Sequence, residues 1–381
     1  MPAELILTNA RVVTADRVIN GTLMIRDGVI AALDEGSSQL PQAQDLGGDY
    51  LMPGLVELHT DNLEKHMTPR PGVDWPTASA VLTHDAQIIA AGITTVFDAL
   101  SIGDINPRGK RMQQLPAMLD AVASAEAAGD TRAEHRLHLR CEVCHPDALS
   151  LFRDLVGHPL VKLVSVMDHS PGQRQFARED KYREYYMGKY HLSAAEMDAF
   201  SDQQTANSRQ YSDRQRLAVV EICQARGLAL ASHDDATLAH VEESAGLGMA
   251  IAEFPTTLEA AEASHARGLK VLMGAPNVVR GGSHSGNIAA ADLAQRGVLD
   301  ILSSDYYPAS LLQAAFLLAA FDNSYDLPKA IATVSLLPAQ AVGLDDRGEI
   351  RPGLRADLLQ ASDRQGQPVV RQVWRQGRRV F

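Results

Sequence analysis

The chain has 381 residues, of which 45 % are hydrophobic, and its formal net charge at pH 7 is −12. This length fits two or three small domains, or one (β/α)₈ barrel of about 250 residues with additional structure. The negative charge argues against nucleic-acid binding, and a chain without an apolar run of about 20 residues is not expected to span a membrane. The first residues lack the basic and apolar regions of a secretory signal, so we expect a cytoplasmic protein.

Both ends of the sequence are rich in short strand-like runs. Residues 5–33 form such runs on either side of an Asp27-Gly28 turn, and the sequence from Gly343 onwards has the same character. We therefore predict a β-sandwich domain assembled from both termini, residues 1–52 and 343–381.

The middle of the chain, residues 53–342, alternates between apolar runs and helical patterns. Eight such runs favour a parallel (β/α)₈ barrel over an open sheet. The predicted strands are residues 55–58, 93–97, 137–141, 161–167, 228–231, 250–254, 269–273 and 299–303. The predicted helices are residues 113–127, 148–156, 214–226, 235–245, 257–267 and 310–321.

The stretch 171–212 is long, polar and rich in Arg, Lys and Tyr. A connection of this length inside a compact domain is usually functional or disordered. We predict that it forms a lid over the mouth of the barrel.

The cysteines Cys141, Cys144 and Cys223 are too few for a disulfide framework. The run Cys141–His145 has the spacing of a haem attachment site, but haem attachment requires export. A structural zinc site would need further ligands nearby. We expect two thiols at the end of a buried strand.

Histidines and acidic residues stand at the C-terminal ends of six predicted strands, where barrel enzymes build their active sites. His59 and Asp61 are two residues apart and therefore face the same way. Imidazole and carboxylate together suit Zn, Mn or Fe. One such residue is most often an ordinary polar side chain at a loop, but their repetition predicts a metal site. The predicted ligands are His59, Asp61, Glu142, His169, His233 and Asp305.

Several motifs resemble a known family. LMPGLVELHTDN (51–62) resembles the first barrel strand of the amidohydrolase superfamily, which normally carries His-x-His after a Pro-Gly turn. Here Asp61 replaces the second His, which argues against the ordinary deaminase and amidase activities. Five stretches resemble the PhnM family of the phosphonate carbon–phosphorus lyase pathway, and the similarity covers essentially the whole chain. They are residues 59–76, 167–176, 254–257, 277–287 and 303–308.

The resemblance implies hydrolysis of a small phosphorylated substrate, α-D-ribose 1-alkylphosphonate 5-triphosphate, to the 5-phosphate and pyrophosphate. It also implies two divalent ions. Members of the superfamily often bridge two metals with a carbamylated lysine or with a glutamate. We prefer Glu142 as the bridging carboxylate, because Lys162 lies near the start of its strand, at the wrong end of the barrel. The alternative is that Glu142 supports a ligand from behind. The oligomeric state is left open, with a homodimer among the options.

A triphosphate needs fixed cations, and Arg suits phosphate because its fork bonds two oxygens. We favour Arg70, Arg174 and Arg280, each of which follows a strand in a Pro/Gly-rich loop, although a single Arg is usually a solvated surface residue. The Gly-rich run that ends at Asn287 either adds backbone N–H donors for phosphate or is a flexible loop, and the sequence leaves both open. The other candidates are Arg108, Lys110, Arg178 and Lys181.

Asp305 follows the last strand and is expected to accept the proton of the attacking water. Attack is expected at the α-phosphorus, because pyrophosphate leaves more readily than a sugar alkoxide. His284 is the expected proton donor, with His66 as an alternative. Two other hypotheses remain: a C–N hydrolase (deaminase or cyclic amidase), and a scaffold subunit without activity. Pyrophosphate release tests the first, and metal analysis tests the second.

Overall fold

The computed structural model describes residues 4–70, 72–104, 111–176, 179–283, 286–321 and 325–381. These residues divide into two units. The terminal unit comprises residues 1–98, 121–136 and 273–381, and the central unit comprises residues 99–120 and 137–272.

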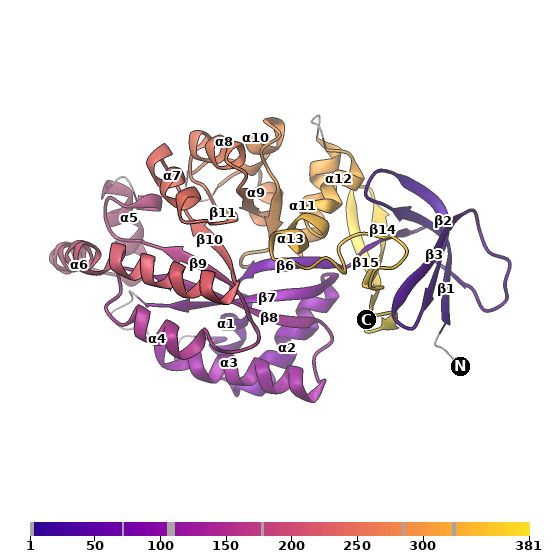
Figure 1. Ribbon diagram of the computed structural model, residues 1–381, viewed down its shortest axis with the longest axis horizontal. Coiled ribbons are helices and arrows are strands. Elements are labelled where there is room, and N and C mark those ends of the chain that lie inside the picture. The colour runs from indigo at the N-terminus through magenta and orange to yellow at the C-terminus, as the bar shows by residue number, and fades with distance from the viewer. Residues whose placement is uncertain (1–3, 71, 105–110, 177–178, 284–285, 322–324) are drawn as a thin grey trace. The chain divides into compact units, whose positions relative to one another are not determined.

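In the terminal unit, strands from both ends of the chain form one mixed sheet (Figure 1). Strand β5 pairs in parallel with β1 and antiparallel with β14, so it joins the N-terminal strands to the C-terminal ones. The prediction of one β-structure built from both termini is confirmed, while the domain limits at residues 53 and 342 stay a prediction. In sheet order the strands are β16 (Arg378–Arg379), β15 (Gln367–Arg375), β14 (Leu358–Arg364), β5 (Tyr50–Pro53), β1 (Glu4–Val13), β2 (Val18–Arg26) and β3 (Val29–Glu35), with β4 (Gln44–Asp45) paired to β1.

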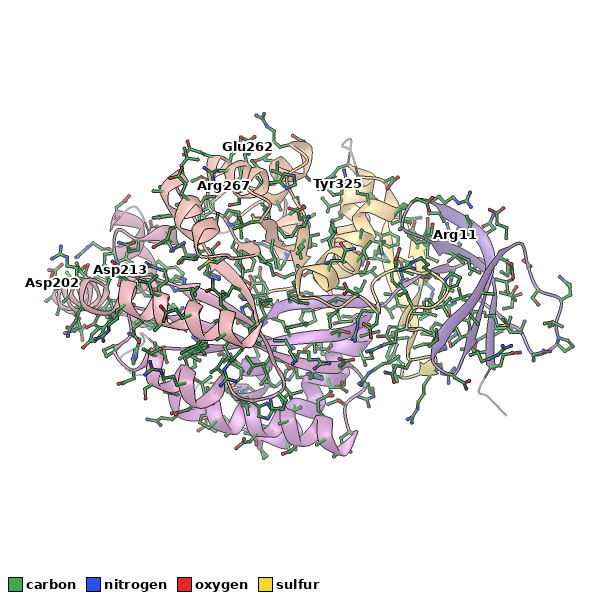
Figure 2. All side chains as sticks on the ribbon, viewed as in Figure 1. Arg11, Asp202, Asp213, Glu262, Arg267 and Tyr325 are labelled. Carbon is green, nitrogen blue, oxygen red and sulfur yellow. The ribbon has the colours of Figure 1, made fainter. Side chains whose placement is uncertain are left out.

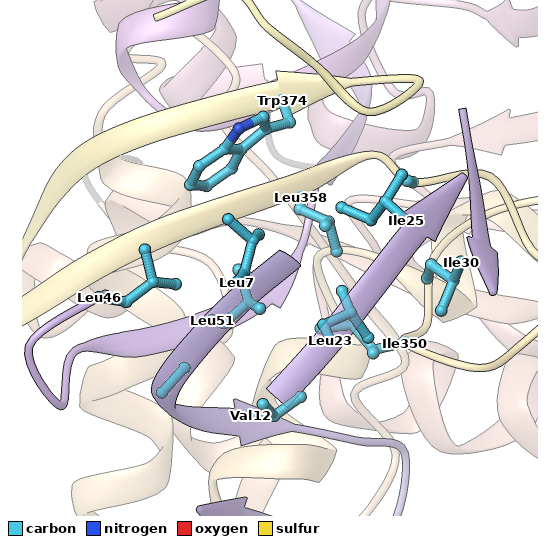
Figure 3. Close-up of a cluster of buried hydrophobic side chains, with 12 residues drawn as sticks. Leu7, Val12, Leu23, Ile25, Ile30, Leu46, Leu51, Ile350, Leu358 and Trp374 are labelled. Atoms are coloured by element: carbon cyan, nitrogen blue, oxygen red, sulfur yellow. The ribbon is translucent and has the colours of Figure 1, made fainter. Parts of the chain in front are cut away.

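An apolar cluster packs on this sheet (Figure 3). Trp374 of β15 is only 1 % exposed, and it shares the cluster with Leu7 of β1, Leu51 of β5 and Leu358 of β14. Truncating a buried Trp to Ala typically lowers stability by about 3–5 kcal/mol. The C-terminal strands are therefore held to the N-terminal ones by side-chain packing as well as by the ladder.

Eight of the described strands form a second, parallel sheet, in which neighbours follow chain order. The two outermost strands, β6 and β13, meet through a parallel bridge between Thr60 and Asp305, so the barrel is nearly closed. The predicted fold class and all eight predicted strands are confirmed within the described residues. The strands are β6 (Leu55–Thr60), β7 (Ile93–Ile102), β8 (Glu134–Glu142), β9 (Val161–Met167), β10 (Ala229–His233), β11 (Ile251–Glu253), β12 (Lys270–Gly274) and β13 (Ile301–Ser303).

Helices occupy most of the connections between these strands. The six predicted helices are present, and further helices occur that the sequence patterns did not indicate. The helices of the terminal unit are α1 (Asn62–Met67), α2 (Thr77–Ala90), α9 (Ala275–Arg280), α10 (Ala290–Gln295), α11 (Ser310–Ala320), α12 (Leu327–Ala332) and α13 (Leu336–Ala341). The others are α3 (Arg111–Ala128), α4 (Ala148–Leu155), η1 (Arg174–Phe176), α5 (Glu179–Tyr190), α6 (Ala194–Arg226), α7 (Leu238–Gly246) and α8 (Leu258–Ala266).

The described part of the stretch 171–212 is largely helical, since it contains η1, α5 and the first half of α6. Helix α6 begins at a capping box in which the Ser193 side chain and the Glu196 side chain each bond the other's backbone N–H. Tyr182, Tyr186 and Met197 pack α5 against α6. Coverage of the barrel mouth by this segment stays a prediction.

Among the described residues, none of the helices is both long and apolar enough to cross a bilayer.

A buried ion cluster ties the start of β8 to the C-terminal segment of the terminal unit. Glu134 accepts hydrogen bonds from Arg347 Nη1 at 2.9 Å and from Arg355 Nη1 at 2.7 Å. Burial opposes ionisation of Glu134, but the two guanidinium groups outweigh it and lower its pKa to about 2. The ionised carboxylate therefore stabilises the folded chain.

Glu134→Gln is expected to lower the free energy of unfolding by roughly 3 kcal/mol at pH 7, because the guanidinium groups of Arg347 and Arg355 each lose a buried carboxylate partner. The folded-state pKa of Glu134 lies below its ordinary value of 4.5, so this stabilisation is present above pH 4.5 and is lost as the pH falls toward 2. Urea unfolding at pH 7 and pH 3 measures the effect, and the difference between wild type and variant should narrow at pH 3.

Glu35→Gln is the matched control, since Glu35 makes an exposed ion pair with Arg17. It should leave the unfolding curve unchanged. An equal difference at both pH values for Glu134→Gln would exclude the ionic explanation.

Candidate metal centre

In the terminal unit, the end of β6 and the segment after β13 bring together three predicted ligands. His59, Asp61 and Asp305 each offer one ligand atom, and these atoms lie within 4.8 Å of one another. The His59 Nε2 atom lies 3.9 Å from Asp61 Oδ1. His59 is 1 % exposed, whereas the Asp61 side chain is 30 % exposed. The cluster is thus closed on one side and accessible on the other.

Backbone pairing fixes this arrangement. The Asp305 N–H donates to the His59 carbonyl at 3.0 Å, and the Asp61 N–H donates to the Asp305 carbonyl at 2.9 Å. Asp305 has a φ of +53°, a left-handed conformation that Asp tolerates better than most residues. The ligand-bearing segments are therefore locked to each other at the seam of the barrel.

Glu57, two residues before His59, reinforces the seam from inside. Its carboxylate accepts the His59 N–H at 2.7 Å and the Ser304 N–H at 2.5 Å. Complete burial raises the pKa of Glu57 to about 7, although these hydrogen bonds act in the opposite direction. Glu57 was missed by the sequence analysis, and the signal was an acidic residue inside an otherwise apolar strand.

The central unit contains a second ligand set, formed by His169, His233 and Asp234. Asp234 Oδ2 lies 3.3 Å from His169 Nε2 and 3.4 Å from His233 Nε2. It is buried and forms no hydrogen bond with the described residues. Donor atoms about 2.0–2.1 Å from a tetrahedral zinc ion lie roughly 3.3–3.4 Å apart, so the two distances from Asp234 Oδ2 fit the edges of such a site.

Carboxylates behind both histidines set their tautomers. His169 Nδ1 bonds Glu142 Oε2 at 2.5 Å, and His233 Nδ1 bonds Glu253 Oε2 at 2.7 Å. Each Nδ1 therefore donates, and each Nε2 faces Asp234, as in carboxylate–histidine–metal arrangements. Burial opposes a charged ring, but Glu142 and Asp234 raise the pKa of His169 to about 10, so this point strongly favours positive charge.

Glu142 has contacts that fit the supporting role better than the role between two metals. One oxygen holds the His169 ring, and the other accepts the His169 N–H at 2.8 Å and the Cys144 thiol at 3.3 Å. Its assignment as a direct ligand stays a prediction. Asp234, in contrast, was not among the predicted ligands. That all the predicted ligands share one centre also stays a prediction.

The predicted phosphate-binding cations lie in different environments. Arg70 and Arg280 are exposed, Arg280 at the end of helix α9 rather than in a loop, and Asn287 is half-buried. Arg174 is 3 % exposed and is paired with Asp235 and Glu243, so its guanidinium already faces two acids. Their roles in phosphate binding stay predictions. His284, Arg108, Lys110, Arg178 and the side chain of Lys181 lie outside the described residues.

Comparison with known proteins bears on this arrangement of ligands. The sequence profile of the Amidohydrolase family matches residues 113–381. The chain belongs to this family. It is also 55 % identical over 378 residues to alpha-D-ribose 1-methylphosphonate 5-triphosphate diphosphatase of Escherichia coli (strain K12), covering 99 % of this chain and 100 % of that one. The resemblance identified from the sequence motifs is confirmed.

More distant relatives share the architecture. The chain is 26 % identical to imidazolonepropionase of Deinococcus deserti, over 100 % of this chain and 96 % of that one. The structure of 5-methylcytosine deaminase from Klebsiella pneumoniae superposes with a TM-score of 0.66 at 16 % identity, covering 99 % and 98 % of the two chains. The structure of N-acetyl-D-glucosamine-6-phosphate deacetylase from Mycobacterium smegmatis superposes with a TM-score of 0.64 at 17 % identity, covering 99 % of this chain and 100 % of that one. These structures support the fold.

Proposed function

We propose that this chain is a metal-dependent diphosphatase in phosphonate catabolism, which hydrolyses α-D-ribose 1-alkylphosphonate 5-triphosphate to the 5-phosphate and pyrophosphate. The observation that carries the proposal is 55 % identity to the Escherichia coli diphosphatase over 99 % of this chain. An anionic small molecule as substrate agrees with a chain whose ligand sets favour divalent cations. We place the reaction in the cytoplasm, leave a homodimer open, and assign no nucleic-acid partner.

Two ligand sets are proposed to hold the metal. His59, Asp61 and Asp305 form one, and His169, His233 and Asp234 form the other. Zn, Mn and Fe all suit these donors. Divalent ions bound there would lower the pKa of water and neutralise phosphate charge.

The remaining steps fall to the chain's own side chains. Water attacks the α-phosphorus, the bond from that phosphorus to the oxygen bridging the α and β phosphates breaks, and pyrophosphate leaves. Asp305 accepts the proton of the water. Arg70, Arg280 and Asn287 are the proposed phosphate contacts, together with Arg174 if substrate displaces its acidic partners. His284 is proposed to protonate the leaving group.

The deciding experiment supplies the methylphosphonate ribosyl triphosphate to the purified enzyme with Zn²⁺ or Mn²⁺ and measures pyrophosphate, orthophosphate and 5-phosphate product. We expect one pyrophosphate per substrate and no orthophosphate. Activity should disappear with a chelator and return with metal. Ammonia release from cyclic amides or aminated bases, without pyrophosphate from the triphosphate, would instead favour the C–N hydrolase.

A further inference from the structure

Asp61 stands at the N-terminal cap of helix α1 but does not cap it. An Asp at this position normally accepts a hydrogen bond from the helix N-terminus, which contributes about 1 kcal/mol. The Asp61 side chain makes no such bond in the described structure, and its carboxylate lies 3.9 Å from His59 Nε2. The Asp61 side chain therefore does not fix the first turn of α1, where the Asn62 N–H donates to Thr60 Oγ1 at 3.3 Å instead.

Asn62, the first residue of α1, provides an anchor for this turn. It is 2 % exposed. Its side-chain nitrogen lies 3.0 Å from His84 Nδ1, 3.0 Å from Gln87 Oε1 and 3.3 Å from His66 Nε2. An amide nitrogen only donates, so His84 Nδ1 accepts. Two residues of α2, His84 and Gln87, thus hold the start of α1.

His84 is in turn fixed by a fully buried chain of side chains. His84 Nε2 donates to Asp98 Oδ1 at 2.6 Å, and His135 Nδ1 donates to Asp98 Oδ2 at 2.7 Å. His135 Nε2 lies 3.4 Å from Asp85, whose carboxylate also accepts the Arg132 N–H at 2.9 Å. His84, Asp85, Asp98 and His135 are all 0 % exposed.

The short distances between His84, Asp98 and His135 distinguish this row of hydrogen-bonded side chains from a further metal site. His84, Asp98 and His135 also gather three ligand atoms. Contacts of 2.6 and 2.7 Å are those of charge-assisted hydrogen bonds, whereas ligand atoms around one zinc ion lie roughly 3.3 Å apart. Burial opposes charge on His135, but Asp98 and Asp85 raise its pKa to about 10, so the charged groups compensate one another.

We propose that Asn62, held by the buried chain His84–Asp98–His135, fixes the first turn of α1 in place of a side-chain cap and thereby positions Asp61 as a metal ligand. Asn62 and His84 are positioning residues, since they act through Asp61. The inference rests on the proposed role of Asp61 in metal binding.

The test uses the full-length chain stripped of metal and titrated with Zn²⁺ against a chelating dye. Asn62→Asp keeps the size of the side chain but removes the donor to His84, and His84→Leu removes the acceptor. Both variants are expected to lower the affinity for one of the bound zinc ions by roughly 10–100-fold, the usual effect of losing a group that supports a metal ligand. His84→Gln retains an amide donor and a carbonyl acceptor and should stay within about threefold of wild type.

Thr83→Ala is the matched control on the same helix, because Thr83 is exposed and its hydroxyl donates to the Ser79 carbonyl within α2. It should bind zinc as wild type does. Asp61→Asn must lower the affinity for the same zinc ion. Wild-type affinity in that variant would overturn both the metal role of Asp61 and the inference. Wild-type affinity in Asn62→Asp, with Asp61→Asn impaired, would overturn the inference alone. Loss of both ions together with a collapse of the metal-free melting temperature would reduce the buried chain to a structural role and also overturn it.

Discussion

Asp305→Asn is expected to lower kcat for pyrophosphate release by roughly 10²–10⁴-fold, the range typical for removal of a general base. The amide cannot accept the proton of the attacking water, but it keeps the size of the side chain and one oxygen. The backbone N–H of Asp305 still donates to the His59 carbonyl, so the barrel seam should persist. With metal supplied in excess, so that the lost carboxylate ligand does not empty the site, KM should change little, and initial rates over a range of substrate concentrations separate the two constants.

Asp292→Asn is the control for this variant, because Asp292 is an exposed residue in the first turn of α10 in the same unit. It should retain wild-type kcat. Wild-type kcat in Asp305→Asn would require another proton acceptor. The obvious acids are already engaged: Asp168 accepts hydrogen bonds from Ser170, Ser208 and Ser212, and Glu253 holds the ring of His233.

The barrel was predictable because its strands are buried on both faces. Such strands appear as uninterrupted apolar runs, as in β7, where all ten residues are buried. The runs predicted from residues 55 to 303 therefore coincide with strands in the described chain. The two ends of the chain were predictable for a different reason, since their short strands and Gly-containing turns repeat at both termini.

Helices α5 and the first part of α6 were missed because their sequence lacks an apolar stripe. Asp202 and Asp213, labelled on α6 in Figure 2, are exposed, and the Asp213 side chain is 94 % exposed. Much of the helix is similarly polar, so periodicity did not reveal it. The Ser193–Glu196 capping box was the available signal, because it marks a helix start without depending on hydrophobicity.

The ligand positions were predictable to the extent that parallel strands end at one edge of a sheet. What the sequence could not give is the direction of each side chain after its strand. Asp234 has a φ of +57°, which turns its carboxylate between two histidines, and nothing in the run His233-Asp234-Asp235 specifies that turn. Nor does sequence reveal that Arg174 pairs with Glu243, 69 residues away.

Asp234→Asn is expected to remove the ion proposed for the central unit. Asn has the same shape and also tolerates the left-handed backbone at this position, so the fold should not be strained. Its side chain is neutral, however, and no longer provides the negative oxygen that lies between the Nε2 atoms of His169 and His233. Loss of a direct ligand should exceed the roughly 10–100-fold effect seen for supporting partners.

The measurement combines elemental analysis with melting curves taken with and without Zn²⁺. A ligand that binds only the folded chain stabilises it by about 2.7 kcal/mol at a concentration 100 times its Kd. Wild type should therefore melt at a markedly higher temperature with zinc, and Asp234→Asn should lose much of that increase while its metal-free melting temperature stays close to wild type. Asp235→Asn alters the neighbouring acid, which pairs with Arg174 instead, and should do the reverse: a lower metal-free melting temperature with the zinc effect retained. Full metal content in Asp234→Asn would exclude Asp234 as a ligand and would return that place to Glu142, the carboxylate predicted from the sequence.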